Sequence, residues 1–129
     1  MHNRLVVVFD DEMDIRELLR YNLTKEGFDV ITFPSPLYGY EFLKEHKPDV
    51  ILCDWLMPDL DGIEFCQELK KNEQLQQVPI IMISCKSNEA DIVTAFRTGA
   101  MDYVIKPFRY KELVARINRI IETQPRFTG

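Results

Sequence analysis

Four short apolar runs in the chain each end at a polar side chain, and this pattern constrains the fold more than any other feature. The runs span residues 5–9, 50–53, 80–83 and 103–105, and the side chains that follow them belong to Asp10, Asp11, Asp54, Ser84 and Lys106. Short runs rich in Val and Ile are typical of parallel strands buried on both faces. The carboxyl ends of parallel strands lie at one edge of a sheet. We therefore expect three carboxylates, one hydroxyl and one ammonium group to gather there and form a reaction site.

The segments between these runs have the periodicity of helices. Apolar side chains recur at spacings of three and four within 15–23, 63–70, 92–96 and 113–121, while 28–33 reads as a further strand and 37–45 as a helix containing Gly39. Asn88 suits an N-cap, and Gly27 and Gly99 lie where helices end. An alternation of strand and helix repeated five times predicts an α/β fold, with a doubly wound parallel sheet and helices on both faces.

Length and composition are those of a single domain, which we expect to span residues 1–122, with 123–129 as a linker or terminal tail. The net charge of −5 gives this segment no electrostatic reason to bind nucleic acid. No apolar stretch approaches the roughly 20 residues of a membrane span. The cysteines Cys53, Cys66 and Cys85 do not form a disulfide framework, so we expect free thiols in a reducing, cytoplasmic protein.

The acidic residues at the strand ends favour a divalent cation. Asp10, Asp11 and Asp54 would repel one another if they were packed closely without a cation between them. Clustered carboxylate oxygens suit Mg²⁺. Taken alone, Asp10 and Asp11 are also suited to cap the first helix, Lys106 is equally well a solvated loop residue, and Ser84 a turn residue. One fold places all of them at the same edge, and this favours a shared site over separate structural roles.

The chain resembles the receiver domain of two-component response regulators from residue 4 to about 122. Four segments carry the resemblance: Val-Phe-Asp-Asp-Glu at 8–12, Asp-Trp-Leu-Met-Pro-Asp-Leu-Asp-Gly at 54–62, Ile-Ser at 83–84 and Lys-Pro-Phe at 106–108. Each is weak alone, but together, in this order at four strand ends, they are specific. The resemblance implies a flavodoxin-like five-stranded sheet in the order 2-1-3-4-5. That order reverses between the first and third strands, where ligands bind in such sheets.

The resemblance also implies a role for each acidic residue. Asp54 is the phosphoryl acceptor, which attacks the phosphorus of a phosphohistidine in a sensor histidine kinase or phosphotransfer protein. Asp11 and Asp54 bind Mg²⁺ directly, or Mn²⁺ in its place, and Asp10 acts mainly through water. The backbone carbonyl of Leu56 completes the protein ligands. Lys106 pairs with a phosphoryl oxygen. The domain catalyses only its own phosphorylation and dephosphorylation and is not otherwise an enzyme.

The family further implies a switch and a cis peptide bond before Pro107. Ser84 moves to donate a hydrogen bond to the new phosphoryl group, and Tyr103 turns inward to fill the vacated space. Without the family context, Tyr103 is equally well an ordinary strand aromatic. The surface formed by the fourth helix, fifth strand and last helix then changes and is read by an output domain or a partner. Cys85 stands where the family usually has a small residue such as alanine.

The segment 109–116 resembles the winged-helix transcription-factor subclass of receivers. Members of that subclass dimerise through the fourth helix, fifth strand and last helix by salt bridges. Asp102 and Arg116 match two of the charged positions, whereas Ile92 and Met101 replace charged residues. We expect a homodimer through this surface, DNA binding only through a C-terminal output domain, and no membrane contact.

Two other classes use similar residue types. A phosphatase of the haloacid-dehalogenase type needs a second acid two residues after its nucleophile, and Leu56 holds that position here. A flavodoxin-like FMN binder needs a Ser/Thr/Gly-rich loop after the first strand, but the acidic residues 10–12 would repel phosphate without a metal. Both features favour the signalling switch.

Overall fold

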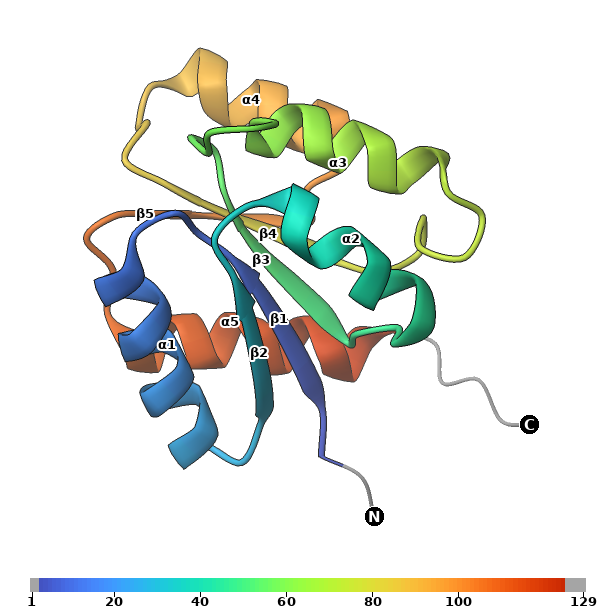
Figure 1. Cartoon of the computed structure of the whole chain (residues 1–129). Coiled ribbons are helices and arrows are strands. Elements are labelled where there is room, and N and C mark those ends of the chain that lie inside the picture. Colours follow the sequence, from blue (N-terminus) through green and yellow to red (C-terminus); the bar gives the residue numbers. More distant parts are fainter. Residues whose placement is uncertain (1–2, 125–129) are drawn as a thin grey trace.

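The computed structural model describes residues 3–124, in which five strands alternate with five helices (Figure 1). The strands are β1 (Leu5–Phe9), β2 (Asp29–Phe33), β3 (Val50–Asp54), β4 (Ile80–Ser84) and β5 (Asp102–Ile105). The helices are α1 (Met13–Lys25), α2 (Pro36–Glu45), α3 (Gly62–Lys71), α4 (Glu89–Thr98) and α5 (Tyr110–Thr123).

The strands form one parallel sheet in the order β2-β1-β3-β4-β5. This confirms the predicted α/β fold and its strand order. From β1 the chain first adds β2 on one side and then crosses to β3 on the other, so the order reverses between β1 and β3. The carboxyl ends of these two central strands therefore border the crevice in which such sheets bind ligands.

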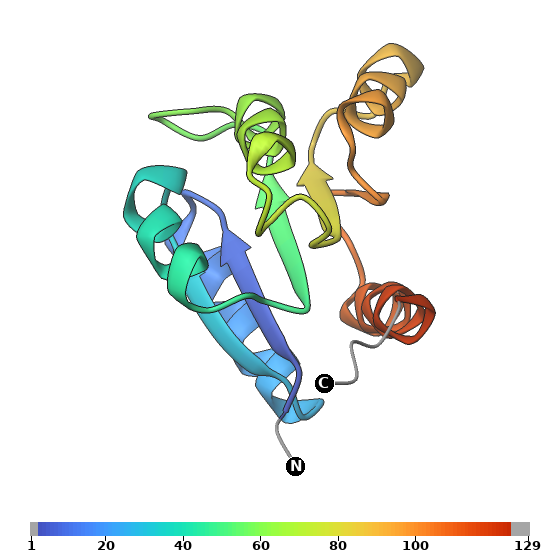
Figure 2. The same ribbon diagram turned by 90° about the vertical axis from the view of Figure 1, so that its right-hand side faces the viewer.

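Different helices cover the two faces of the sheet, α1 and α5 on one face and α2, α3 and α4 on the other (Figures 1 and 2). Val6 and Val8 of β1 pack with the apolar side chains of α1 and α5. Their neighbours Val7 and Phe9 pack with those of α2 and α3. Because successive side chains of a strand point to opposite faces, a strand covered on both faces must be apolar throughout. This is the physical reason for the continuous apolar runs in the sequence.

The helix ends agree with the predicted signals. Asn88 caps α4, because its side chain accepts a hydrogen bond from the backbone N–H of Asp91 at 2.9 Å. Gly27 and Gly99 follow α1 and α4 with φ values of 95° and 126°. These angles favour glycine because a β-carbon would be strained there.

The predicted boundaries differ from the structure by single residues at several ends. Helix α5 ends at Thr123, and residues 125–129 of the predicted tail lie outside the described residues, so the division into a domain and a tail stays a prediction. Cys53, Cys66 and Cys85 are free thiols, as expected. None of the helices within 3–124 combines the length and the apolar character that crossing a bilayer requires.

Candidate functional site

Strand register brings two carboxyl groups together at the ends of β1 and β3. Phe9 lies beside Cys53 in this parallel pair. The residues that follow, Asp10 and Asp54, are therefore neighbours at the carboxyl edge of the sheet. Both are enclosed by the surrounding structure, with Asp10 2% and Asp54 6% exposed. Two strands thus hold two acidic side chains in one largely dehydrated place.

Lys106 supplies the positive charge that this pair requires. It follows β5, and its backbone N–H donates to the carbonyl of Ser84 at 2.8 Å, which fixes its position beyond the end of β4. The Lys106 Nζ donates to Asp10 Oδ2 at 2.9 Å and to Asp54 Oδ2 at 3.2 Å. The side chain of Lys106 is only 8% exposed. One ammonium group therefore bridges the two buried carboxylates.

The pKa shifts show which force dominates at each group. Burial raises the pKa of Asp10, and it outweighs the hydrogen bonds from the Glu12 N–H and from Lys106, which lower it. Burial also raises the pKa of Asp54, and the adjacent charge of Asp10 adds to this effect. Burial alone would lower the pKa of Lys106, but its bonds and charge interactions with the two aspartates raise it well above its usual range. Lys106 is therefore a permanent cation, whereas the two carboxyl groups hold their protons more tightly than usual.

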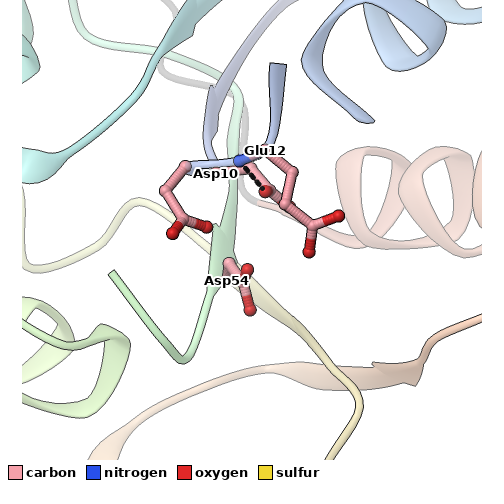
Figure 3. A group of neighbouring side chains, drawn as sticks. Asp10, Glu12 and Asp54 are labelled. Carbon is pink, nitrogen blue, oxygen red and sulfur yellow. Dashed lines mark hydrogen bonds between the residues drawn. The ribbon is translucent and has the colours of Figure 1, made fainter. Parts of the chain in front are cut away.

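Two further carboxyl groups stand at the mouth of the site. Oxygen atoms of Asp10, Asp11, Glu12 and Asp54 all lie within 4.8 Å of one another. Figure 3 shows the side chains of Asp10, Glu12 and Asp54 gathered beyond the ends of β1 and β3. Asp11 and Glu12 are exposed to solvent, whereas the other two are buried. This set of oxygen donors, open on one side, fits a hard cation such as Mg²⁺ that keeps several of its waters.

Capping does not explain Asp10 and Asp11. The N-cap residue of α1 is Glu12, whose side chain makes no capping hydrogen bond. The backbone N–H of Glu12 donates to Asp10 Oδ1 at 2.9 Å. This bond holds one oxygen of Asp10, so that the other points toward Lys106. The acidic pair therefore serves the site more directly than it serves the helix.

The loop after β3 approaches the backbone of Asp54 closely. The N–H of Gly62 donates to the carbonyl of Trp55 at 2.7 Å. A β-carbon on Gly62 would lie 2.4 Å from the Asp54 carbonyl oxygen, so only glycine fits. The N–H of Leu56 donates a long hydrogen bond of 3.4 Å to Asp54 Oδ1. Leu56 itself is 60% exposed. The peptide bond between Lys106 and Pro107 is cis, as predicted.

The predicted switch residues lie beside this site on β4 and β5. Ser84 is 1% exposed, and its Oγ accepts the backbone N–H of Lys86 at 3.1 Å. Tyr103 is 8% exposed, and its hydroxyl donates to the carbonyl of Lys86 at 2.7 Å. Its ring therefore already lies inward in the unmodified chain, whereas the resemblance implies that it turns inward after phosphorylation. Burial raises the pKa of the Tyr103 phenol. The two residues are therefore joined through the backbone of the loop that follows β4.

Sequence reasoning missed one member of this region, Glu12, and one contact, that of Lys86 with Trp55. Glu12 belongs to the acidic cluster, and its Oε1 lies 3.5 Å from the Lys106 Nζ. Its position directly after two aspartates was the available signal. Lys86 lies beside the switch and places its Nζ 4.9 Å from the centre of the Trp55 ring. The spacing of Trp55 and Lys86 in the sequence does not indicate that they are in contact, because the contact depends on the conformation of the loop between β4 and α4.

The comparisons with known proteins agree with this geometry. Residues 6–118 match the response regulator receiver domain. The chain is 40% identical over 116 residues to the phosphate regulon transcriptional regulatory protein PhoB of Rhizobium meliloti, a match that covers 90% of this chain and 51% of that protein. The chain thus spans about half the length of this curated relative. The similarity agrees with the predicted resemblance to a transcription-factor subclass.

Solved structures share the fold. The receiver domain of Francisella response regulator 1452 is 29% identical with a TM-score of 0.87, over 93% of this chain and 98% of that one. The receiver domain of sensor histidine kinase PA1611 from Pseudomonas aeruginosa PAO1 is 24% identical with a TM-score of 0.87, over 95% of this chain and all of that one, and it has a magnesium ion in its active site cleft. From its strand order, its site and these matches, the chain belongs to the receiver domain family of two-component response regulators.

Proposed function

We propose that Asp54 is the residue of this receiver domain that accepts the phosphoryl group. The observation that carries the proposal is the position of Lys106, whose ammonium bridges Asp54 and Asp10. An Asp54 oxygen attacks phosphorus and the bond from phosphorus to the donor nitrogen of a phosphohistidine breaks. The electron pair of that bond stays on the nitrogen, and the ring, which carries a proton on its other nitrogen, leaves as neutral imidazole. The ammonium of Lys106 is close enough to move from the carboxylate to a phosphoryl oxygen.

Asp10, Asp11 and Asp54 are the side chains that would hold Mg²⁺, with the backbone carbonyl of Leu56 as a further ligand. When bound, Mg²⁺ supplies charge neutralisation and alignment of the transferring group. The clustering of four carboxylates supports this assignment. The magnesium ion in the Pseudomonas aeruginosa receiver domain supports it as well. Mn²⁺ suits the same oxygen ligands.

Incubation with acetyl phosphate and Mg²⁺ tests the acceptor. Intact mass spectrometry is expected to show the addition of one phosphoryl group to the wild-type chain and none to Asp54→Ala. Asp59→Ala is the matched control, because Asp59 is an exposed carboxylate in the same loop, and it should be phosphorylated like the wild type. Phosphorylation of Asp54→Ala to the wild-type extent would overturn the assignment.

We further propose that Ser84 and Tyr103 transmit the modification. Ser84 would donate a hydrogen bond from its hydroxyl to the phosphoryl group, Tyr103 would fill the space that Ser84 vacates, and the surface of α4, β5 and α5 would change. Their connection through the loop after β4 supports this coupling. In Ser84→Ala we expect phosphorylation on Asp54 without the full change at this surface, measured by amide NMR shifts. A wild-type surface change in Ser84→Ala would contradict the coupling.

The phosphoryl donor we propose is a sensor histidine kinase or a phosphotransfer protein, and the output is control of transcription through a DNA-binding domain. The similarity to the transcriptional regulator PhoB supports this output. A homodimer through α4, β5 and α5 would serve it. Sedimentation with and without beryllofluoride and Mg²⁺ tests the dimer, since beryllofluoride imitates the phosphoryl group. A monomer under both conditions would overturn the dimer but not the acceptor.

A further inference from the structure

Lys86 lies in the loop between β4 and α4, and its side chain joins two elements on either side of the switch. Its Nζ lies 4.9 Å from the centre of the Trp55 ring and 3.9 Å from Asp91 Oδ2. Trp55 directly follows Asp54 on the polypeptide, and Asp91 lies in the first turn of α4. The side chain of Lys86 is 36% exposed. A cation above an indole ring is attracted by the negative face of the ring, and tryptophan is the most favourable partner.

The backbone of the same residue contacts both switch residues. Its N–H donates to Ser84 Oγ at 3.1 Å, and its carbonyl accepts the hydroxyl of Tyr103 at 2.7 Å. The ring of Tyr103 also packs edge-on against Trp55, with 6.5 Å between ring centres. Trp55, Lys86 and Tyr103 therefore form a closed set of contacts, and we name it the Trp55–Lys86–Tyr103 latch. If the Lys86 side chain leaves the indole, the residue whose carbonyl receives the Tyr103 hydroxyl loses one of its contacts and keeps the bond from its N–H to Ser84 Oγ.

We propose that Lys86 is a positioning residue of the switch, which holds the Tyr103 ring in its buried orientation through its contact with Trp55. This inference rests on the proposed function of Tyr103 as a switch residue. The contacts of the latch use the side chains of Trp55, Lys86 and Tyr103 and one backbone carbonyl, and none of them uses the Asp54 carboxylate. The latch therefore acts on Tyr103 whether or not Asp54 is modified, and it reduces the shift in population that phosphorylation must supply.

The ion pair between Lys86 and Asp91 does not by itself explain why the Lys86 side chain lies over Trp55. At 3.9 Å and with both side chains partly exposed, it is a weak surface pair. Lys44 provides a matched comparison elsewhere in the molecule. Its Nζ lies 5.1 Å from the centre of the Tyr40 ring and 3.2 Å from Glu41 Oε1, so it has the same two kinds of partner but is remote from β4 and β5.

Fluorine NMR of protein labelled with 3-fluorotyrosine tests the latch in the unmodified chain. The Tyr103 resonance is assigned with Tyr103→Phe, and its shift between H₂O and D₂O reports exposure of the ring. In Lys86→Met we expect the ratio of buried to exposed Tyr103 to fall about two- to fivefold, the factor that an exposed cation–π contact supplies. Lys86→Arg should retain the wild-type value, because a guanidinium also stacks on indole. Lys44→Met should leave Tyr103 unchanged.

A Tyr103 exposure in Lys86→Met equal to that of the wild type would overturn the proposal. Exposure in Lys86→Arg as high as in Lys86→Met would overturn it too, because the cation would then not be the cause. The measurement uses no phosphoryl donor, so its result is independent of whether Asp54 is the acceptor.

A second measurement connects the latch to the reaction. Lys86→Met should weaken the binding of beryllofluoride and Mg²⁺ by about two- to fivefold, and this loss should vanish in a Tyr103→Ala background. An equal loss in both backgrounds would mean that Lys86 acts on the anion directly, which would overturn the positioning role.

Discussion

Lys106 Nζ lies 2.9 Å from Asp10 Oδ2, in a hydrogen bond between residues 96 positions apart in the chain. The bond joins the ends of β1 and β5, which are separated in the sheet by β3 and β4. Asp54, at the end of β3, shares the same ammonium group. A single lysine thus compensates two buried carboxylates, and its charge is available to whatever anion forms on either of them.

Removal of this ammonium group should destabilise the fold. In Lys106→Met, Asp10 and Asp54 keep their burial but lose their common cation, and a buried charge without a partner is costly. We expect the free energy of unfolding to fall by about 3–5 kcal/mol at neutral pH in the absence of metal, measured by urea denaturation. Lys44→Met removes an exposed ion pair and should cost less than about 1 kcal/mol. Equal stability of the two variants would show that Lys106 does not compensate the buried pair.

Magnesium should stabilise the protein through its acidic cluster. At a concentration 100 times its dissociation constant, a ligand that binds only the folded state adds about 2.7 kcal/mol to the free energy of unfolding. In Asp11→Ala we expect this gain to disappear, while the metal-free protein becomes slightly more stable because one like charge has gone. Thermal denaturation with Mg²⁺ and with EDTA measures both effects. Asp59→Ala should respond to Mg²⁺ like the wild type, and a full Mg²⁺ response in Asp11→Ala would remove Asp11 from the ligand set.

The positions of Asp10, Asp54 and Lys106 could be predicted because each lies at the end of a strand or directly after one. Strand ends are visible as the ends of apolar runs, and parallel pairing places such ends at one edge. The strand order and the cis bond before Pro107 came from the family resemblance rather than from the apolar pattern. They too agree with the structure.

Contacts between side chains of different elements were harder to predict. Arg116 Nη1 binds both carboxylate oxygens of Asp102 within one chain, at 3.0 and 2.9 Å, although sequence matching assigned both residues to salt bridges of a dimer. The contact of Lys86 with Trp55 was not predicted at all. Such pairs depend on rotamers and on how a helix or loop docks on the sheet, and the spacing of residues along the chain does not encode either.

Gly62 should be intolerant of even one methyl group. A β-carbon there would lie 2.4 Å from the Asp54 carbonyl oxygen and 2.9 Å from Trp55 Cα, and both are backbone atoms that cannot rotate away. We expect Gly62→Ala to cost about 1–3 kcal/mol of stability and also to slow phosphorylation by acetyl phosphate, because relief of the clash displaces Asp54.

Gly27→Ala is the control for Gly62→Ala, since a β-carbon at Gly27 meets nothing within 4 Å and only the backbone angle is strained. It should lose stability by about 1 kcal/mol and be phosphorylated at the wild-type rate. A Gly62→Ala protein with normal phosphorylation kinetics would show that the loop can move without disturbing the acceptor.

The raised pKa values of Asp10 and Asp54 predict opposite pH dependences with and without metal. In the metal-free protein both pKa values lie above those of the unfolded chain. Their contribution to stability is therefore fully present below the unfolded pKa and is lost as the pH rises through the folded values. Bound Mg²⁺ favours the ionised carboxylates, so with metal the pKa values of the folded state lie below those of the unfolded chain. The contribution with metal is then present at neutral pH and lost as the pH falls.

The contribution of Asp10 can be isolated by comparison with Asp10→Asn, since asparagine imitates the protonated acid. In EDTA, Asp10→Asn should match the wild type near pH 4 and become the more stable protein as the pH rises to about 7. In saturating Mg²⁺ the wild type should be the more stable protein near neutral pH, because the variant has lost a ligand oxygen with a full charge. Urea denaturation across this range, at constant ionic strength, measures the difference. If that difference changes with pH in the same direction in both solutions, Asp10 takes no part in holding the metal, and its burial alone governs its titration.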